Sequence, residues 1–318
     1  MYDKHAKGLS YTAGFFMLIA FTVASIILAS IISIPVWKAM TGTSFLDMEK
    51  NMTNPAFADA YKVIQVITML IGFLLPAVFT AFLLSRKPSR LMGFPGKITS
   101  QQAGLVILVM ISALFVSGSL GYLNQQIPLP DSLKLRFDNM EDEYMQQMEA
   151  IIGLNNIGQL IISLLIMALL PAFCEEALFR GGFQNFLNRA TNNPWVSIIT
   201  VSLIFSAAHL SWYGFLPRLF LGLILGVIYH YSGRLWLSIL AHFLNNAIAL
   251  VMLYAYKQQG KPVDEAMSEA GDMAYWGFLA LPLVIALLVI FIKRSPKPVM
   301  DEKPDPVNDL LRNTPFEK

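Results

Sequence analysis

The sequence is poor in cysteine and in charged residues. Its 318 residues include a single cysteine, Cys174, which excludes an internal disulfide and a cysteine-rich zinc site. Only 14% of the residues are charged, whereas a soluble protein carries about 25%. The net charge of +2 is too small to indicate a nucleic acid partner. These deficits point away from a soluble protein.

Long apolar runs are what the sequence has in excess, since 55% of the residues are hydrophobic. A membrane-spanning helix needs about 20 apolar residues. The first run is longer than the ~7–15-residue core of a signal peptide, so we expect it to remain as a span. The sequence thus predicts an all-α, polytopic transmembrane helix bundle of about eight spans, or seven if the two short ones near Leu210 are one. The expected spans are about 11–36, 61–85, 102–123, 156–178, 195–212, 216–232, 235–256 and 274–292.

Basic and acidic residues alternate from one connection to the next. Lysine and arginine precede the first expected span and follow the second, fourth, sixth and eighth. Acids gather in 131–149 and 264–272. Because cytoplasmic loops carry an excess of Lys and Arg, we expect both termini in the cytoplasm. The expected location is a bacterial cell (inner) membrane, with the lipid bilayer as one partner.

The acidic segment Ser132–Gly153 has apolar residues at three- and four-residue intervals. This is the pattern of an amphipathic helix. Such a helix can lie on the outer membrane surface or form a solvated cap over the bundle, and the pattern leaves both open. The tail from Lys297 is rich in Pro, Asp and Lys, which predicts disorder.

Two glutamates and an arginine follow the apolar run 160–170. Ionisable residues in a membrane segment are costly and are functional candidates. Glu176 and Arg180 are four residues apart, so they share a helix face and can pair. Glu175 is turned about 100° away and stays free to act as a base toward water. The alternative is a cluster that caps the helix at the cytoplasmic interface.

Two later apolar segments each carry a histidine with a partner four residues away. Phe205 and His209 share one helix face, as do His242 and Asn246. Taken singly, His209 is equally typical of an interface residue, and His242 of a clamp between helices. Taken with Glu175, these groups supply a base, a second water-orienting group and oxyanion donors, the parts needed to hydrolyse an amide.

The three motifs, in this order and on successive apolar segments, resemble the CPBP family of CAAX and bacteriocin-processing (Abi-type) intramembrane proteases. This family is related to the type II CAAX prenyl endopeptidase. The resemblance covers about residues 156–250 and includes the connecting stretch Phe220–Gly226. It implies a bundle of about eight helices with an intramembrane catalytic cavity. The chain would then divide into N-terminal spans with the outer amphipathic segment (1–155), a catalytic core (156–256), and a last span with the tail (257–318).

The resemblance also implies roles for single residues. Glu175 would be the catalytic base and His209 would help to activate the water. His242 and Asn246 would stabilise the oxyanion. The supporting residues, which would hold the geometry of the site, are Glu176, Arg180 and Phe205.

Metal dependence and substrate stay open at this point. A divalent metal such as zinc would find ligands in Glu175, His209 and His242, which is the metalloprotease alternative, but a metal-free glutamate mechanism uses the same residues. The substrate would be a peptide or membrane protein, lipidated or not. The alternative function is a non-catalytic membrane protein, a transporter or an immunity or scaffold protein, that uses the polar cluster structurally.

The expected spans contain one conflict of depth. Glu175 falls near the cytoplasmic end of the fourth span, whereas His209 falls ~21 Å into the fifth at 1.5 Å per residue. The two meet only if the fourth helix continues past Arg180 or the fifth begins outside the bilayer. Gly181, Gly182 and the amphiphilic residues 183–187 favour a continued, buried helix, bent at Pro171.

Overall fold

The computed structural model describes the chain except for residues 1–4, 52–53, 153, 261–274 and 296–318. The acids of 264–272, the first residue of the eighth expected span and the tail from Lys297 lie outside the described residues. The described part is helical throughout, apart from an isolated antiparallel bridge between Ala6 and Ser85. The α-helices are α1 (Tyr11–Thr41), α2 (Ala58–Ile67), α3 (Leu75–Leu84), α4 (Pro88–Met92), α5 (Ser100–Gln125), α6 (Asp131–Ile152), α7 (Ile157–Ser163), α8 (Leu170–Glu176), α9 (Asn185–Thr191), α10 (Pro194–Ala208), α11 (Phe215–Ser232), α12 (Leu235–Gln258) and α14 (Leu281–Arg294).

Several of these helices are joined end to end by π-helical turns. Thr68–Leu74 joins α2 to α3, Leu164–Leu169 joins α7 to α8, and Ala177–Gln184 joins α8 to α9. The first two turns precede Pro76 and Pro171, residues that lack the N–H needed for a regular helical hydrogen bond. Short 3₁₀ turns complete the described structure at Phe45–Asp47, Glu49–Asn51, Pro55–Phe57 and Trp276–Ala280.

Seven helical segments of the described chain are long and apolar enough to cross a membrane. An eighth, α10, is apolar but has only 15 residues. The protein is therefore an all-α, multi-pass integral membrane protein, as predicted. The seven long segments are Tyr11–Thr41, Pro55–Leu84, Ser100–Gln125, Ile157–Thr191, Phe215–Ser232, Leu235–Gln258 and Trp276–Arg294.

Two of the predicted boundaries are wrong. The fourth span does not end at 178 but continues through the π-helical turn to Thr191. The added polar side chains of Arg180, Gln184 and Asn185 are buried and hydrogen-bonded, so low hydropathy did not end the helix. The fifth span ends at Ala208 rather than 212, because the chain turns at Leu210, whose φ is +53°.

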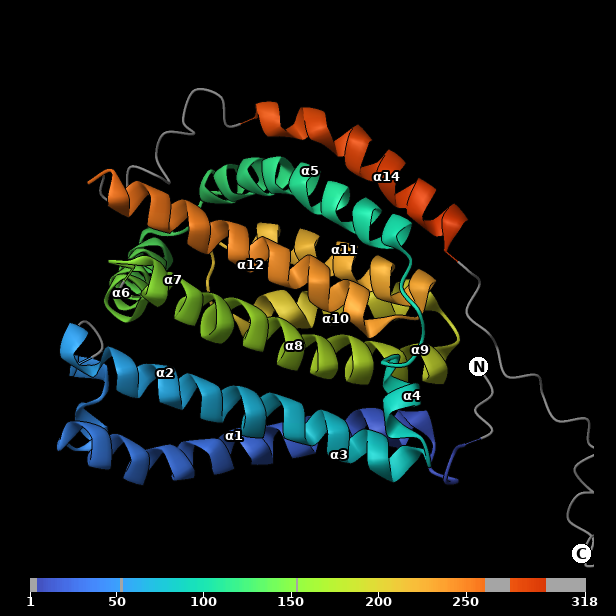
Figure 1. The fold of residues 1–318 in the computed structure, drawn as a ribbon, viewed down its shortest axis with the longest axis horizontal. Helices are drawn as coiled ribbons and strands as arrows, with labels where there is room; N and C mark the ends of the chain where they lie inside the picture. Colours follow the sequence, from blue (N-terminus) through green and yellow to red (C-terminus); the bar gives the residue numbers. More distant parts are fainter. Residues whose placement is uncertain (1–4, 52–53, 153, 261–274, 296–318) are drawn as a thin grey trace, which may run out of the picture.

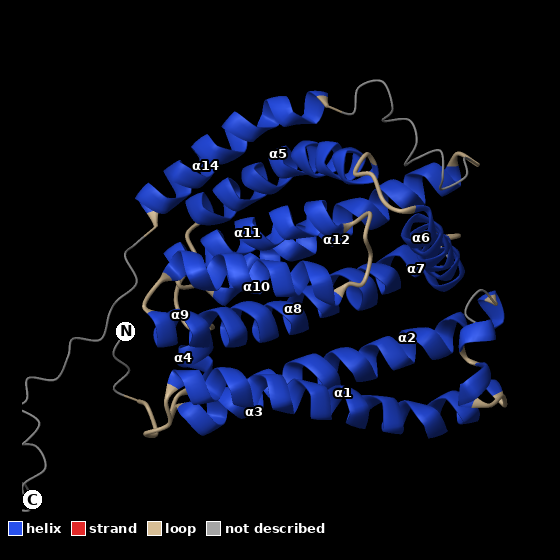
Figure 2. Ribbon diagram, turned by 180° about the vertical axis from the view of Figure 1, so that it is seen from behind, coloured by secondary structure: helices blue, strands red, loops and turns tan. Residues whose placement is uncertain are grey.

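The spanning helices lie roughly side by side in layers (Figure 1). Helices α1, α2 and α3 form one side, α5 and α14 form the other, and α8, α10, α11 and α12 lie between them. The view from behind shows the same arrangement (Figure 2). The start of α1 and the end of α14 lie at one end of the bundle, the end that also carries α4 (Figure 1).

Glycines allow α10 and α11 to approach closely. A Cβ on Gly222 would lie 2.9 Å from the Cβ of Ser202, and one on Gly226 would lie 3.0 Å from Ile198 Cγ2. Small residues four apart are typical of tight helix contacts in membranes. This close contact brings the backbone of α11 within reach of side chains on the Ile157–Thr191 helix, which supports the site described below.

Helix α6 lies across the other end of the bundle and is viewed end-on in Figures 1 and 2. The predicted amphipathic helix is therefore confirmed as an element. Phe137 packs against Trp212 of the α10–α11 connection, as expected of a cap. Leu133 and Leu135 are exposed, so a membrane-surface location for the rest of the helix stays a prediction.

Candidate active site

The predicted motifs meet at one depth of the bundle. The continuous helical segment Ile157–Thr191, here called the long helix, carries Glu175 well inside the bundle. At 1.5 Å per residue, Glu175 lies ~24 Å from Thr191, and His209 lies ~22 Å from the start of the adjoining α10. Helix α12 starts deeper, where Leu235 contacts the Gly181 position, so His242 is again at the level of the glutamates. Continuation of the fourth helix thus resolves the conflict of depth.

Glu176 and Arg180 form the predicted ion pair, and both side chains are fully buried. Arg180 Nη1 donates to Glu176 Oε1 over 2.8 Å, and Nη2 donates to the carbonyl of Gly222 over 3.1 Å. Buried charges require both a partner and further hydrogen bonds, and here α11 supplies one of these. The arginine therefore fixes α11 against the long helix as well as neutralising Glu176.

His242 enters the site from α12 and lies between the two glutamates. Its Nδ1 is 2.9 Å from Glu176 Oε1, and its Nε2 is 4.0 Å from Glu175 Oε2. An ionised carboxylate only accepts hydrogen bonds, so Nδ1 carries the proton in this pair. Nε2 is then the nitrogen that faces Glu175. The alternative was a clamp from His242 to Asn246 or to a neighbouring helix, and the contact with Glu176 is of the second kind.

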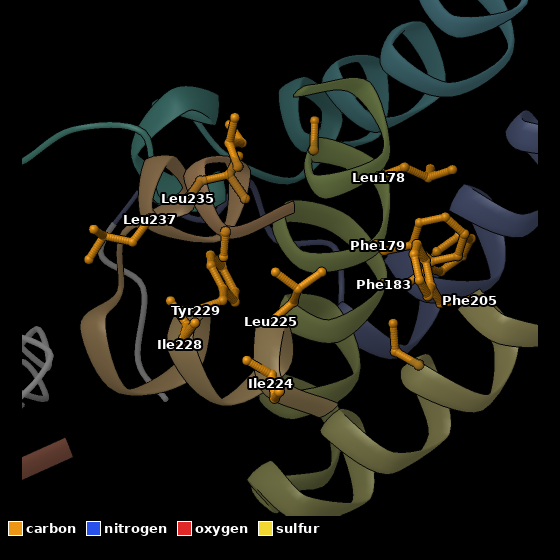
Figure 3. Packing of buried hydrophobic residues seen from close by; sticks show 14 of the residues in the cluster. Leu178, Phe179, Phe183, Phe205, Ile224, Leu225, Ile228, Tyr229, Leu235 and Leu237 are labelled. Carbon is orange, nitrogen blue, oxygen red and sulfur yellow. The ribbon is translucent and has the colours of Figure 1, made fainter. Parts of the chain in front are cut away.

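Phe205 of α10 is the aromatic centre of the cluster. Its ring contacts the imidazoles of His209 and His242, with centroids 4.9 and 5.7 Å away. The Arg180 guanidinium lies over the same ring at 4.7 Å. Figure 3 shows Phe205 beside Phe179 and Phe183 of the long helix. The predicted contact of Phe205 with His209 is confirmed. Phe205 also lies between the charged groups and the surrounding apolar side chains.

His209 is the last residue of the cluster and lies just beyond the end of α10. Its Nδ1 is 2.8 Å from the carbonyl oxygen of Phe205. A carbonyl only accepts, so Nδ1 carries the proton and Nε2 is left as an acceptor. No direct hydrogen bond joins His209 to Glu175 among the described residues. The two histidines are connected through the ring of Phe205.

Glu175 and Asn246 complete the predicted set. Glu175 is 8% exposed, and its Oε2 is buried with no hydrogen-bond partner in the described part of the chain. A buried carboxylate oxygen without a protein partner is costly unless water or a ligand meets it. Asn246 is half-buried one turn beyond His242 and accepts from Asn245 over 3.3 Å.

Two features of the site were missed by the sequence analysis. One is a pair of backbone carbonyls of α11 that accept hydrogen bonds from the long helix. The Gly222 carbonyl accepts from Arg180, and the Gly226 carbonyl accepts from Gln184 over 2.9 Å. Their four-residue spacing was the available signal. The other is Arg218 of α11, whose Nη1 is buried with no hydrogen-bond partner among the described residues. An arginine inside an apolar segment was itself a sufficient signal.

The residues proposed as metal ligands do not form a metal site. Within the described residues, no three His, Cys, Asp or Glu side chains converge as a metal ion requires. Glu175 Oε2 and His242 Nε2 approach to 4.0 Å, whereas no hydrogen bond or ion pair joins His209 to Glu175 among the described residues. A zinc ion takes three protein ligands in a catalytic site, and the three side chains do not meet that requirement as they lie here.

Fold and site together define a polytopic membrane protein with a buried carboxylate–histidine centre. Residues 157–248 match the family model described as type II CAAX prenyl endopeptidase Rce1-like. This match confirms the resemblance predicted from the motifs and supports, at a coarse level, an intramembrane protease.

A relative and the solved structures add limited information. The uncharacterized protein YpbD of Bacillus subtilis (strain 168) is 33% identical over 89 residues, which are 27% of this chain and 42% of YpbD. The chain thus spans less than half the length of this relative. No solved structure matches.

Proposed function

We propose that the chain is an intramembrane endopeptidase that hydrolyses a peptide bond with water activated by Glu175. One observation carries this: Oε2 of Glu175 is buried in the middle of a membrane-spanning helix, has no hydrogen-bond partner among the described residues, and lies 4.0 Å from Nε2 of His242. A carboxylate that only anchored the helix would be paired, as Glu176 is. An unpaired one leaves a position for a water molecule.

In the proposed reaction Glu175 removes a proton from water while the water oxygen attacks the carbonyl carbon of the substrate. His209 contributes through Nε2, which is left as an acceptor and can orient the same water. The proton held by Glu175 then passes to the leaving nitrogen as the C–N bond breaks. The products are a carboxylate and an amine, as general acid–base catalysis requires.

His242 and Asn246 are proposed to stabilise the oxyanion. Because Nδ1 of His242 donates to Glu176, Nε2 can donate only when the ring is an imidazolium. In that form the charges of Glu175, Glu176, Arg180 and His242 sum to zero, which favours their joint burial in a medium of low dielectric. Glu176, Arg180 and Phe205 then act as supports that hold His242 in place.

The proposed substrate is a peptide or a membrane protein that reaches the site from the end of the bundle carrying α4. His242 lies ~10 Å from the start of α12 at 1.5 Å per residue, and that start is bound to Gly93 beside α4. More of the described Lys and Arg residues lie at this end than at the end that carries α6, so the positive-inside rule favours it as the cytoplasmic end. Those at this end are Lys7, Arg86, Lys87, Arg90, Lys97, Arg189, Arg234, Lys293 and Arg294.

Cleavage of a fluorogenic peptide or a membrane-anchored reporter by the protein in lipid vesicles tests the proposal. Glu175→Gln keeps the size of the side chain but removes the base, so the rate should fall by about 10²–10⁴-fold. His209→Ala should also lose most activity. The matched control is Glu143→Gln, on the exposed face of α6. A scaffold or transporter would show no cleavage that depends on Glu175, and full activity of Glu175→Gln would refute the assignment.

A further inference from the structure

The connection between α10 and α11, here named the 209–214 loop, begins at His209. Three side chains of α6 contact it, although α6 is about 70 residues earlier in the chain. Ser211 Oγ donates to Glu141 Oε2 over 3.0 Å, and the Tyr213 hydroxyl donates to Asp138 Oδ1. The pairs formed by Glu175, Glu176, Arg180 and His242 do not depend on these contacts. The function of the contacts between α6 and the loop therefore requires a separate explanation.

An aromatic stack strengthens the same contact. The ring of Trp212 lies parallel to that of Phe137, with centroids 5.5 Å apart and planes at 11°, and its other neighbour is Phe215. Phe137 and Glu141 are four residues apart on α6 and therefore share one face with Asp138. Helix α6 thus presents one apolar and two acidic side chains to three of the six residues of the loop.

The backbone of the loop is held in an unfavourable conformation next to His209. Leu210 has a φ of +53°, in the left-handed region that residues other than glycine avoid, and its side chain is 75% exposed. Because Leu210 has little packing of its own, the conformation must be imposed by the residues that follow. Strained backbone of this kind persists only where the surroundings fix it, and it is common beside functional groups.

Other contacts hold the backbone of the loop. The hydroxyl of Ser206 donates to the carbonyl of Phe215 over 2.6 Å, and Asn124 of α5 binds the Trp212 carbonyl and the Leu216 N–H, each over 2.9 Å. The side chains of Ser211 and Tyr213 are restrained by α6. Without α6, the Tyr213 hydroxyl would lose its acceptor, and Ser211 would keep only its contact with the Gly214 N–H.

We propose that α6 positions His209 for catalysis, with Tyr213–Asp138 and Ser211–Glu141 as positioning pairs. This inference rests on the proposed function of His209. It makes α6 a support that stays in place during turnover, not a cover that opens. Tyr213 and Ser211 touch no reacting group. They act through the loop, which sets where the Nε2 of His209 lies relative to Glu175.

Kinetics of the full-length protein in lipid vesicles test the positioning pairs. Tyr213→Phe and Asp138→Asn should each lower kcat about tenfold, the effect of one hydrogen bond to a charged group, with KM unchanged. The double variant should lose little more than Tyr213→Phe alone, because Tyr213→Phe removes the hydrogen bond whose acceptor charge Asp138→Asn removes. Tyr144→Phe, an exposed tyrosine on the same helix, should behave as the unaltered protein. Unchanged kcat in both single variants, or additive losses, would overturn the inference.

Covalent linkage separates a fixed support from a cover that opens. In a variant that carries both Ser211→Cys and Glu141→Cys, a short, reducible bis-thiosulfonate linker joins the two new thiols. The buried Cys174 stays protected from the reagent. The linked protein should recover at least the activity lost through the two substitutions. If linking instead abolished cleavage and reduction restored it, α6 would have to move during turnover, and the inference would be wrong.

A measurement independent of activity keeps this inference apart from the proposed function. Hydrogen–deuterium exchange of residues 209–214 should be faster in Tyr213→Phe and Asp138→Asn than in Tyr144→Phe. Faster exchange with unchanged kcat would refute the positioning role while leaving the protease intact. If instead the unaltered protein showed no Glu175-dependent cleavage, the proposed function would fail and the positioning role with it, whereas the exchange data would still establish the α6 contact.

Discussion

Replacing Arg180 by methionine should destabilise the protein strongly. The guanidinium is fully buried and binds both Glu176 and the Gly222 carbonyl. Methionine fills a similar volume but leaves the Glu176 carboxylate with His242 as its remaining charged neighbour. Removing one partner of a buried ion pair costs about 3–5 kcal/mol. This is a large part of the 5–15 kcal/mol that is typical of a folded protein.

The assay is reversible unfolding in mixed micelles, followed by circular dichroism as the fraction of denaturing detergent rises. Lys134→Met is the matched control, because Lys134 and Asp138 are also four residues apart but largely exposed, and such pairs contribute about 0–1 kcal/mol. The double variant Arg180→Met/Glu176→Gln should be more stable than Arg180→Met alone, since it no longer leaves the charge of Glu176 buried without its arginine. Equal losses for Arg180→Met and Lys134→Met, or a double variant less stable than the single one, would refute the reasoning.

Two further predictions concern packing and pH. Gly222→Ala should lower stability by about 1–3 kcal/mol through overpacking, because its Cβ would lie 2.9 Å from that of Ser202, whereas Gly118→Ala, with nothing within 4 Å, should be neutral or stabilising in the same unfolding assay. The hydrogen bond from Tyr213 lowers the pKa of Asp138 from its ordinary 3.8 and raises that of Tyr213 to about 12. Docking of α6 should therefore be fully stabilised between about pH 4 and 10, weaken as the pH falls through the lowered pKa of Asp138, and weaken again as it rises toward 12. Exchange of the 209–214 loop, corrected for its intrinsic pH dependence, measures this, and an acid response unchanged in Asp138→Asn would contradict it.

Local spacing was enough to predict part of the site. The pair of Glu176 with Arg180 and the contact of Phe205 with His209 follow from helical geometry, which places residues four apart on one face. The contact of His242 with Glu176 joins residues 66 positions apart. Periodicity carries no information on such pairings, because they depend on how α12 packs against the long helix.

Hydropathy failed where polar groups are satisfied inside the bundle. Gln184 and Asn185 lower the apolar character of the fourth span, yet both are buried and bind the backbone carbonyls of Gly226 and Leu91. A hydropathy profile treats each side chain as if it faced lipid. It therefore ended the span too early and produced a conflict of depth that the molecule does not have.

The division of the chain at 155 and 256 stays a prediction. The contacts of α6 with the 209–214 loop show that the segment before 155 and the core are joined at the end of the bundle that carries α6. The location in a bacterial inner membrane with both termini in the cytoplasm is likewise a prediction. It rests on the distribution of Lys and Arg in the described part of the chain.

The shortness of α10 has a consequence for the surrounding lipid. Its 15 residues rise ~22 Å, and the 18 residues of α11 rise ~27 Å, whereas the hydrocarbon core of a bilayer is about 30 Å thick. A span shorter than the bilayer is accommodated by local thinning. Hydrophobic mismatch thus draws the headgroup region inward on this side of the protein. For the proposed reaction, this would shorten the path of water and of a polar substrate chain to Glu175, so the lipid composition should affect the rate of cleavage.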